Sequence, residues 1–191
     1  MTETRGRRSR RPLVVFTIGH GARTPAAFVH LLSAAGVTRL IDVRTRPGSR
    51  RHPHFGRDAL ASALPDAGVT YEWWPELGGL RSPRPDSPYT ALGVDAFRGY
   101  ADHMSTPEFA DALVRLLTEA GRAPTTVMCA ESRWERCHRR MIADALDVAG
   151  CRVLHLVEGG PEAHRRSPEL RVVGGELRYD VRSGQATLDE A

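Results

Sequence analysis

The stretch VMCAESRWERCHRRMI, residues 127–142, decides how this chain folds. Its first residues are apolar, as in a buried strand that ends near Cys129, and a short polar turn then leads to a helix expected to open near Cys137. The connection between this strand and the helix therefore carries many reactive groups: two thiols, a carboxylate, an imidazole and several guanidinium groups. Open α/β sheets bind ligands at such places, because the loops converge at the carboxyl ends of the strands. The stretch predicts a site at that edge of a sheet.

Strand and helix patterns alternate on both sides of this stretch. Continuous apolar or β-branched runs predict buried strands, and apolar residues spaced by three and four predict helices. The expected strands are 13–18, 38–43, 69–74, 125–130 and 151–157, and the expected helices are 25–35, 57–67, 95–104, 107–120 and 136–149. The alternation predicts an α/β three-layer sandwich with a mainly parallel central sheet of about five strands.

The domain organisation follows from the same patterns. Residues 13–158 are expected to form one α/β domain, with a lid-like excursion at 80–94 that is rich in Pro and Ser. Residues 1–12 form a basic tail, interpreted as flexible, with a nucleic-acid-binding arm as the alternative. Residues 159–191 are an extension, either packed on the domain or partly disordered, in which 170–181 predict a small hairpin.

Composition narrows the class of protein. The 191 residues carry a formal net charge of +4, and all 27 basic residues are arginine, a side chain suited to phosphate and carboxylate groups. Three cysteines make no disulfide framework in a chain of this length, which favours a reducing, cytoplasmic location. No stretch approaches the roughly 20 apolar residues of a membrane helix, so no membrane partner is expected.

The cysteines are candidates for covalent chemistry. Cys129 is a possible nucleophile if its pKa is depressed, and an inert buried thiol otherwise. Cys137 could be a thiolate with His138 as acid or base. A metal ion bound by both thiols, His138 and His20 is not expected, because the thiols are too far apart in sequence for a short zinc motif and neighbouring residues on a helix point about 100° apart. No dinucleotide or phosphate-loop motif is present either, so we predict no metal and no cofactor.

Charged residues are expected to gather at the same edge. Asp42, Glu76 and Glu131 each follow or end a predicted strand, and two such carboxylates can divide acid and base roles when their environments differ. The guanidinium groups of Arg44 and Arg139 could bind an anion beside them, or could simply neutralise the carboxylates in a salt-bridged polar edge.

Five short motifs carry a likeness to a known family. They are Thr17-Ile18-Gly19-His20; Asp42-Val43-Arg44 with Pro47, Ser49, Arg50 and Phe55; Tyr71 with Pro75-Glu76-Leu77-Gly78-Gly79; Cys129-Ala130-Glu131; and Cys137-His138-Arg139. In this order they resemble the DUF488 family of small bacterial and archaeal proteins. The resemblance implies a shared fold and pocket, and it supplies no activity. A looser likeness of fold connects the chain with rhodanese-like domains.

Together these observations predict an enzyme, a hydrolase or group transferase, acting on a small anionic or nucleotide-like substrate. The candidate catalytic residues are Cys129, Glu131, His138, Glu76 and His20. The candidate substrate-binding residues are Asp42, Arg44, Ser49, Arg50, Gly78, Gly79, Cys137 and Arg139. Two alternatives stay open: a nucleic-acid-binding or base-processing protein, using the basic loop after Arg44 and the Trp73-Trp74 pair, and a ligand sensor without turnover.

Overall fold

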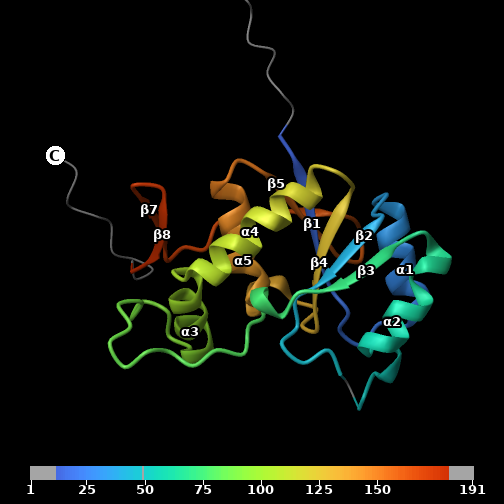
Figure 1. Cartoon of the computed structure of the whole chain (residues 1–191), viewed down its shortest axis with the longest axis horizontal. Helices are drawn as coiled ribbons and strands as arrows, with labels where there is room; N and C mark the ends of the chain where they lie inside the picture. Colours follow the sequence, from blue (N-terminus) through green and yellow to red (C-terminus); the bar gives the residue numbers. More distant parts are fainter. Residues whose placement is uncertain (1–11, 49, 181–191) are drawn as a thin grey trace, which may run out of the picture.

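The structure is a computed structural model that describes residues 12–48 and 50–180. A central sheet carries helices on both faces (Figure 1), which confirms the predicted α/β fold. Its strands lie in the order β3-β2-β4-β1-β5-β6. Their bounds are β1 Val14–Gly19, β2 Arg39–Asp42, β3 Thr70–Trp73, β4 Thr125–Cys129, β5 Arg152–Leu156 and β6 Glu162–Ala163. The first five pair in parallel and β6 pairs antiparallel with β5. The two-residue β6 was not expected, because it has no apolar run.

The helices begin and end close to where the sequence predicts them. Two of them open with a threonine cap followed by proline: the Oγ1 atoms of Thr24 and Thr106 accept hydrogen bonds from backbone N–H groups one turn on. The α-helices are α1 Pro25–Ala34, α2 Arg57–Ala63, α3 Asp95–Met104, α4 Pro107–Ala120 and α5 Arg139–Val148. Short 3₁₀ turns cover Pro53–Phe55, Pro65–Ala67, Pro75–Leu77 and Trp134–Arg136. Within the described ranges, no helix has both the length and the apolar character of a membrane span.

Alternating side chains of the strands fill two separate cores, one on each face of the sheet. Ile41 and Val127 pack with the residues of α3, α4 and α5, whereas their neighbours Leu40 and Met128 pack with those of α1 and α2. Figure 1 shows the same division, with α1 and α2 beside each other and α3, α4 and α5 gathered on the other side. This is the three-layer arrangement that continuous apolar strands require, since both faces are covered.

The chain after β6 returns to the domain as a hairpin. Strands β7 (Leu170–Val173) and β8 (Glu176–Tyr179) pair antiparallel, and Tyr179 is buried against the core next to α5. Most of the predicted basic tail, residues 1–11, lies outside the described residues, as do Ser49 and residues 181–191.

One predicted boundary was wrong, and it affects the site. The helix expected from residue 136 or 137 begins at Arg139, after the 3₁₀ turn Trp134–Arg136. Between them Cys137 is extended, with φ −122° and ψ 148°. The cysteine therefore precedes the helix and does not share its geometry with His138.

Candidate active site

A pocket of about 580 Å³ opens at the carboxyl end of β4, near the middle of the sheet. Segments that follow β2, β3 and β4 and the start of α3 contribute to it. Its lining residues are Arg44, Thr45, Arg46, Gly79, Leu80, Val94, Ala96, Phe97, Cys129, Ala130, Glu131, Glu135, Arg136, Cys137 and His138. Some of the predicted site residues therefore meet at one cavity, as expected from their positions at strand ends, and others do not line it.

Both thiols and one imidazole meet in this pocket. The Nδ1 atom of His138 lies 3.9 Å from Sγ of Cys129 and 3.7 Å from Sγ of Cys137. The expectation that Cys137 and His138 point apart was wrong, because Cys137 has extended backbone and only the residues from Arg139 onward are helical. All three atoms lie within 4.8 Å of one another, close enough for one soft metal ion. However, a metal-bound histidine normally donates its second ring N–H to an acceptor. Nε2 of His138 is buried without a partner among the described residues, so we assign no metal here.

The two thiols are not equivalent. A hydrogen bond from Cys129 lowers the pKa of Cys137 well below its usual range, and His138 and the charge of Arg139 act in the same direction against the effect of burial. The same bond, together with burial, raises the pKa of Cys129 well above its usual range. These directions make Cys137 the thiol of the pair that ionises first.

Arg139 supports the segment that carries the thiols. Its side chain is buried, and Nη1 donates to Oγ1 of Thr17 over 3.1 Å. Nη2 donates to the backbone carbonyl groups of Glu131 and Ser132. A Cβ atom on Gly19 would overlap that same carbonyl group of Glu131, so only glycine fits where the strand β1 ends. The predicted substrate-binding arginine thus uses its Nη donors on β1 and on the loop, and its buried Nε atom has no hydrogen-bond partner in the described part of the chain.

His20, Asp42 and Arg44 form a closed cluster beside the pocket. The guanidinium of Arg44 donates twice to Asp42, over 2.8 and 2.6 Å, and its Nη1 lies 3.3 Å from Nε2 of His20. Tyr71 donates to the same carboxylate. Burial lowers the pKa of His20 to about 4, so the ring is neutral near pH 7. Of the three residues, Arg44 alone lines the pocket.

The remaining predicted residues divide between the pocket and its support. Glu131 is exposed and lines the pocket, and its Oε1 accepts from the backbone N–H of Arg133 over 3.0 Å. Glu76 does not line it, and its Oε2 atom is buried without a hydrogen-bond partner in the described part of the chain. Arg50 is exposed and also lies outside the lining, and Ser49 is outside the described residues.

Gly78 and Gly79 allow two neighbours to approach closely. A Cβ on Gly79 would lie 2.3 Å from Nδ1 of His138, and one on Gly78 would lie 2.4 Å from Oγ1 of Thr45. The two glycines therefore set the position of the imidazole and of the loop after β2, which is a support role that the motif alone did not specify.

The pocket has features that sequence reasoning missed. One wall is apolar: Leu80 and Val94 are 68% and 54% exposed, and Ala96 and Phe97 continue it. Arg46 and Arg136 are also exposed in the lining, and within residues 12–48 and 50–180 neither guanidinium has a hydrogen-bond or ion-pair partner. For Arg136, its position next to Cys137 was the one feature of the sequence that pointed to a place in the pocket.

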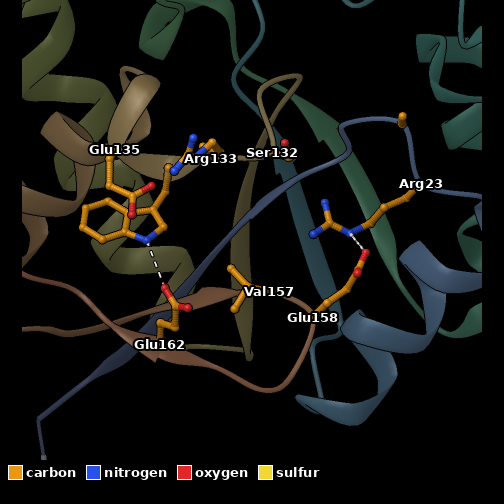
Figure 2. A pocket seen from close by; sticks show the side chains of 9 residues that line it. Arg23, Ser132, Arg133, Glu135, Val157, Glu158 and Glu162 are labelled. Carbon is orange, nitrogen blue, oxygen red and sulfur yellow. Dashed lines mark hydrogen bonds and ion pairs between the residues drawn. The ribbon is translucent and has the colours of Figure 1, made fainter.

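A second hollow of about 530 Å³ lies behind the loop that carries Ser132 and Arg133 (Figure 2). In it, Glu158 pairs with Arg23 over 3.7 Å and Glu162 accepts from the indole of Trp134 over 3.4 Å. Glu135 lines both cavities, so the loop that carries it borders each of them.

A buried polar network, also missed, continues from Arg139 into the core. Oγ1 of Thr17 lies 2.7 Å from Nδ1 of His155, whose Nε2 lies 3.1 Å from Nδ1 of His164, and Nε2 of His164 lies 3.0 Å from Oδ1 of Asp144. The chain of contacts runs from the guanidinium of Arg139 through Thr17 and the two imidazoles to the carboxylate of Asp144. Burial lowers the pKa of His155 to about 3, which agrees with a neutral ring.

Asp144 closes this network with every acceptor used. Besides His164, it accepts from the backbone N–H and the hydroxyl of Ser167 and from the hydroxyl of Tyr179, over 2.9, 2.6 and 3.0 Å. It thereby ties the C-terminal hairpin to α5.

Comparison with known proteins gives one match. The model of a family described as "Domain of unknown function DUF488" matches residues 24–146, most of the folded chain. The first of the five motifs, residues 17–20, lies just before this range. No curated protein and no solved structure matches.

Proposed function

The chain belongs to the DUF488 family, and we propose that it is a thiol-dependent enzyme that hydrolyses or transfers a group of a small anionic substrate. In this proposal Cys137 is the nucleophile and the 580 Å³ pocket holds the substrate. Cys129 and His138 stabilise the attacking sulfur, and Glu131 serves as general base.

The observation that carries the proposal is the convergence of two sulfurs and Nδ1 of His138 in an open cavity. A thiolate needs hydrogen-bonding groups and positive charge nearby: Nδ1 of His138 lies 3.7 Å from Sγ of Cys137, and Cys129, His138 and the charge of Arg139 all lower the pKa of Cys137. The sequence left Cys129 as a possible nucleophile and Cys137 as a possible thiolate, and the raised pKa of Cys129 favours Cys137.

The charge of Arg139 supports the same assignment. A buried guanidinium normally lies against a carboxylate, because an unpaired buried charge is costly. Arg139 is 1% exposed and, in the described ranges, no carboxylate lies within 4.0 Å of it. A thiolate on Cys137 supplies the missing negative charge in the same interior, and each charge stabilises the other.

The chemical step follows from these roles. The Cys137 thiolate attacks the electrophilic centre of the substrate, an S–acyl or S–phosphoryl bond forms, and the leaving group departs with a proton from solvent. Glu131, on the pocket wall, then takes a proton from water as the water attacks the intermediate. The thiolate returns and the second product leaves, or another nucleophile replaces the water in a transfer reaction.

The preference for an anion rests on Arg46 and Arg136. Both line the pocket with their donors uncommitted within the described residues, whereas Arg44 and Arg139 are largely occupied by protein groups. Trp73 and Trp74 are less available for base stacking: Trp74 is buried, and the indole of Trp73 donates to the backbone carbonyl of Arg44.

The test compares iodoacetamide and iodoacetate as probes of the reduced protein. We expect Cys137 to be alkylated with an apparent pKa below the roughly 8.5 of a free thiol. We also expect iodoacetate to be favoured over iodoacetamide at Cys137 relative to Cys151, which is buried at the opposite end of the sheet. Turnover of p-nitrophenyl esters and phosphates, lost in Cys137→Ser, would establish the enzyme. A Cys137 that reacts only on unfolding, with no turnover, would overturn the proposal.

A further inference from the structure

We propose that Cys129 and Cys137 are a redox-active pair, in which Cys129 closes a disulfide onto Cys137 after a small hydroperoxide has oxidised it. This inference deepens the proposed function, because it rests on the Cys137 thiolate, and it assigns Cys129 as the resolving thiol.

The first argument is proximity. The two Sγ atoms lie within 4.8 Å of each other and share the Nδ1 atom of His138 as a neighbour. The Cys129 thiol also lowers the pKa of the Cys137 thiol, as expected for two sulfurs at this range. A thiol this close to a second sulfur can reach a product that forms on that sulfur.

The second argument is freedom of movement. Cys129 is held at the end of β4, where its backbone carbonyl accepts from the N–H of His20. Cys137 is extended between a 3₁₀ turn and α5, and of the six residues that separate it from Ala130, Trp134 alone is buried and the others are exposed. One sulfur therefore ends a paired strand, whereas the other follows a connection of mostly exposed residues, and closing the disulfide requires that connection to move.

The third argument is the division of roles between the sulfurs. Thiol–disulfide and peroxide chemistry needs one ionised attacking sulfur and one thiol able to condense afterwards. The pKa of Cys137 lies below its usual range and that of Cys129 above it. The pocket gives a small oxidant access, and its apolar wall at Leu80 and Val94 suits an organic hydroperoxide.

The steps balance with the hydroperoxide as the only oxidant. The Cys137 thiolate attacks one peroxide oxygen, the O–O bond breaks, and the alkoxide or hydroxide takes a proton from solvent and leaves as alcohol or water. Cys137 is now a sulfenic acid. The sulfur of Cys129 then attacks it: the S–S bond forms, the S–O bond breaks, and the hydroxide leaves with the thiol proton as water. The two sulfurs lose two electrons and the peroxide gains them.

The third cysteine provides an internal control. Cys151 precedes β5, which starts opposite Val14, whereas Cys129 lies opposite Gly19 at the other end of the sheet. Five strand residues separate the two ends, about 16 Å. Burial raises the pKa of Cys151. Cys151 should therefore neither react rapidly nor reach the pair.

The experiment treats the full, reduced protein with a small excess of hydrogen peroxide or cumene hydroperoxide, blocks free thiols with N-ethylmaleimide, and maps tryptic peptides. Arginines 133 and 136 lie between the two cysteines, so trypsin separates them and a disulfide appears as a linked pair of peptides. We expect the Cys129–Cys137 link to dominate and to disappear with dithiothreitol. The variant Cys151→Ser should behave like the wild type.

Two variants complete the test. In Cys129→Ser, dimedone should trap about tenfold more sulfenic acid on Cys137, because the resolving thiol is gone. In Cys137→Ser, the peroxide reactivity of Cys129 should fall about tenfold or more, because that thiol stays protonated. A wild type that accumulates dimedone adduct without the linked peptides would overturn the inference. If Cys137 still prefers iodoacetate in that case, the proposed function is kept and the redox inference fails. If instead the disulfide forms fast but Cys137 shows neither anion preference nor turnover, the redox pair is kept and the proposed function fails.

Discussion

Two buried polar clusters lie on either side of Arg139. They differ in how many of their hydrogen-bonding atoms have a partner. In the network from Thr17 to Asp144, every hydrogen-bonding atom of the two imidazoles and the carboxylate has a partner. In the thiol cluster, Nε2 of His138 has no partner within the described residues, the two sulfurs lie within 4.8 Å of each other, and a cavity reaches them. The difference teaches that burial of a histidine says little by itself. A closed cluster stabilises a fold, whereas an open cluster beside a cavity is available for chemistry.

The largest expected effect comes from removing Asp144, the acceptor at the end of the closed network. The variant Asp144→Ala leaves the donors of His164, Ser167 and Tyr179 without their acceptor, and we expect a loss of about 3–5 kcal/mol in the free energy of unfolding. Urea unfolding measures it. The matched control is Asp147→Ala on the same helix, whose carboxylate forms a partly exposed ion pair with Arg166 and should contribute less than about 1 kcal/mol.

If Asp144→Ala fails to fold, Asp144→Asn keeps an acceptor for His164 and should be intermediate. By contrast, Cys129→Ser keeps a small protonated donor in the open cluster and should stay within about 1 kcal/mol of the wild type. Equal losses for Asp144→Ala and Cys129→Ser would remove the distinction between the two clusters.

Acid provides the second test. The pKa of His155 in the folded protein is about 3 and that of His20 about 4, both below the ordinary 6.5. Between about pH 6.5 and these values the unfolded chain binds more protons, so stability is present above pH 6.5 and is lost as the pH falls. Each residue adds a slope of at most about 1.4 kcal/mol per pH unit. Urea unfolding of His155→Gln from pH 7 to 4 should show a shallower slope than the wild type.

The control for this prediction is His30→Gln, a substitution at an exposed position of α1, which should keep the full slope. A wild-type stability that is flat between pH 6.5 and 4 would mean that the two imidazoles are not held neutral.

The third test disturbs the open cluster without touching a thiol. Gly79→Ala places a methyl group where Nδ1 of His138 lies, so the imidazole must move away from the sulfurs. We expect the alkylation rate of Cys137 at neutral pH to fall about tenfold, the effect of a pKa raised by one unit. Gly93→Ala is the matched control, because its methyl group would meet no atom within 4 Å. Equal rates in both variants would show that His138 does not govern the thiolate.

The smallest expected effect concerns the mouth of the pocket. Arg136→Gln should lower the iodoacetate-to-iodoacetamide rate ratio at Cys137 by about twofold to fivefold, the range for an exposed charge. The iodoacetamide rate should hardly change. Arg133→Gln, on the same loop but in the lining of the second hollow, is the control. A ratio that falls equally in both variants would indicate a diffuse positive field and would favour the nucleic-acid alternative.

The sequence allowed the layers of the fold to be predicted well, because each strand buried on both faces is an unbroken apolar run. It also located the pocket, since motifs at strand ends must converge at one sheet edge. The start of α5 was misplaced by two to three residues, and that error led to the wrong expectation for Cys137 and His138. Helix termini depend on local capping, which composition constrains weakly.

The closed network could not have been predicted in the same way. Thr17 and His155 touch because β1 pairs with β5, and the two residues are 138 positions apart. The order of strands in a sheet is not written in any local pattern, so a contact of that kind has no local signature. The division of charge between Cys129 and Cys137 likewise depends on which sulfur lies nearer to which donor.

The apolar wall of the pocket has a consequence for how such a protein diversifies. The thiols and His138 come from residues 129–138, whereas Leu80, Val94 and Phe97 come from the excursion after β3 and the start of α3. In the proposed enzyme, the apolar part of the selectivity thus lies on a different segment from the reactive residues. A lineage can exchange the excursion and acquire new substrates while its reactive loop stays unchanged. An engineered chimaera would be joined at the same boundary, with the excursion of one family member and the reactive loop of another.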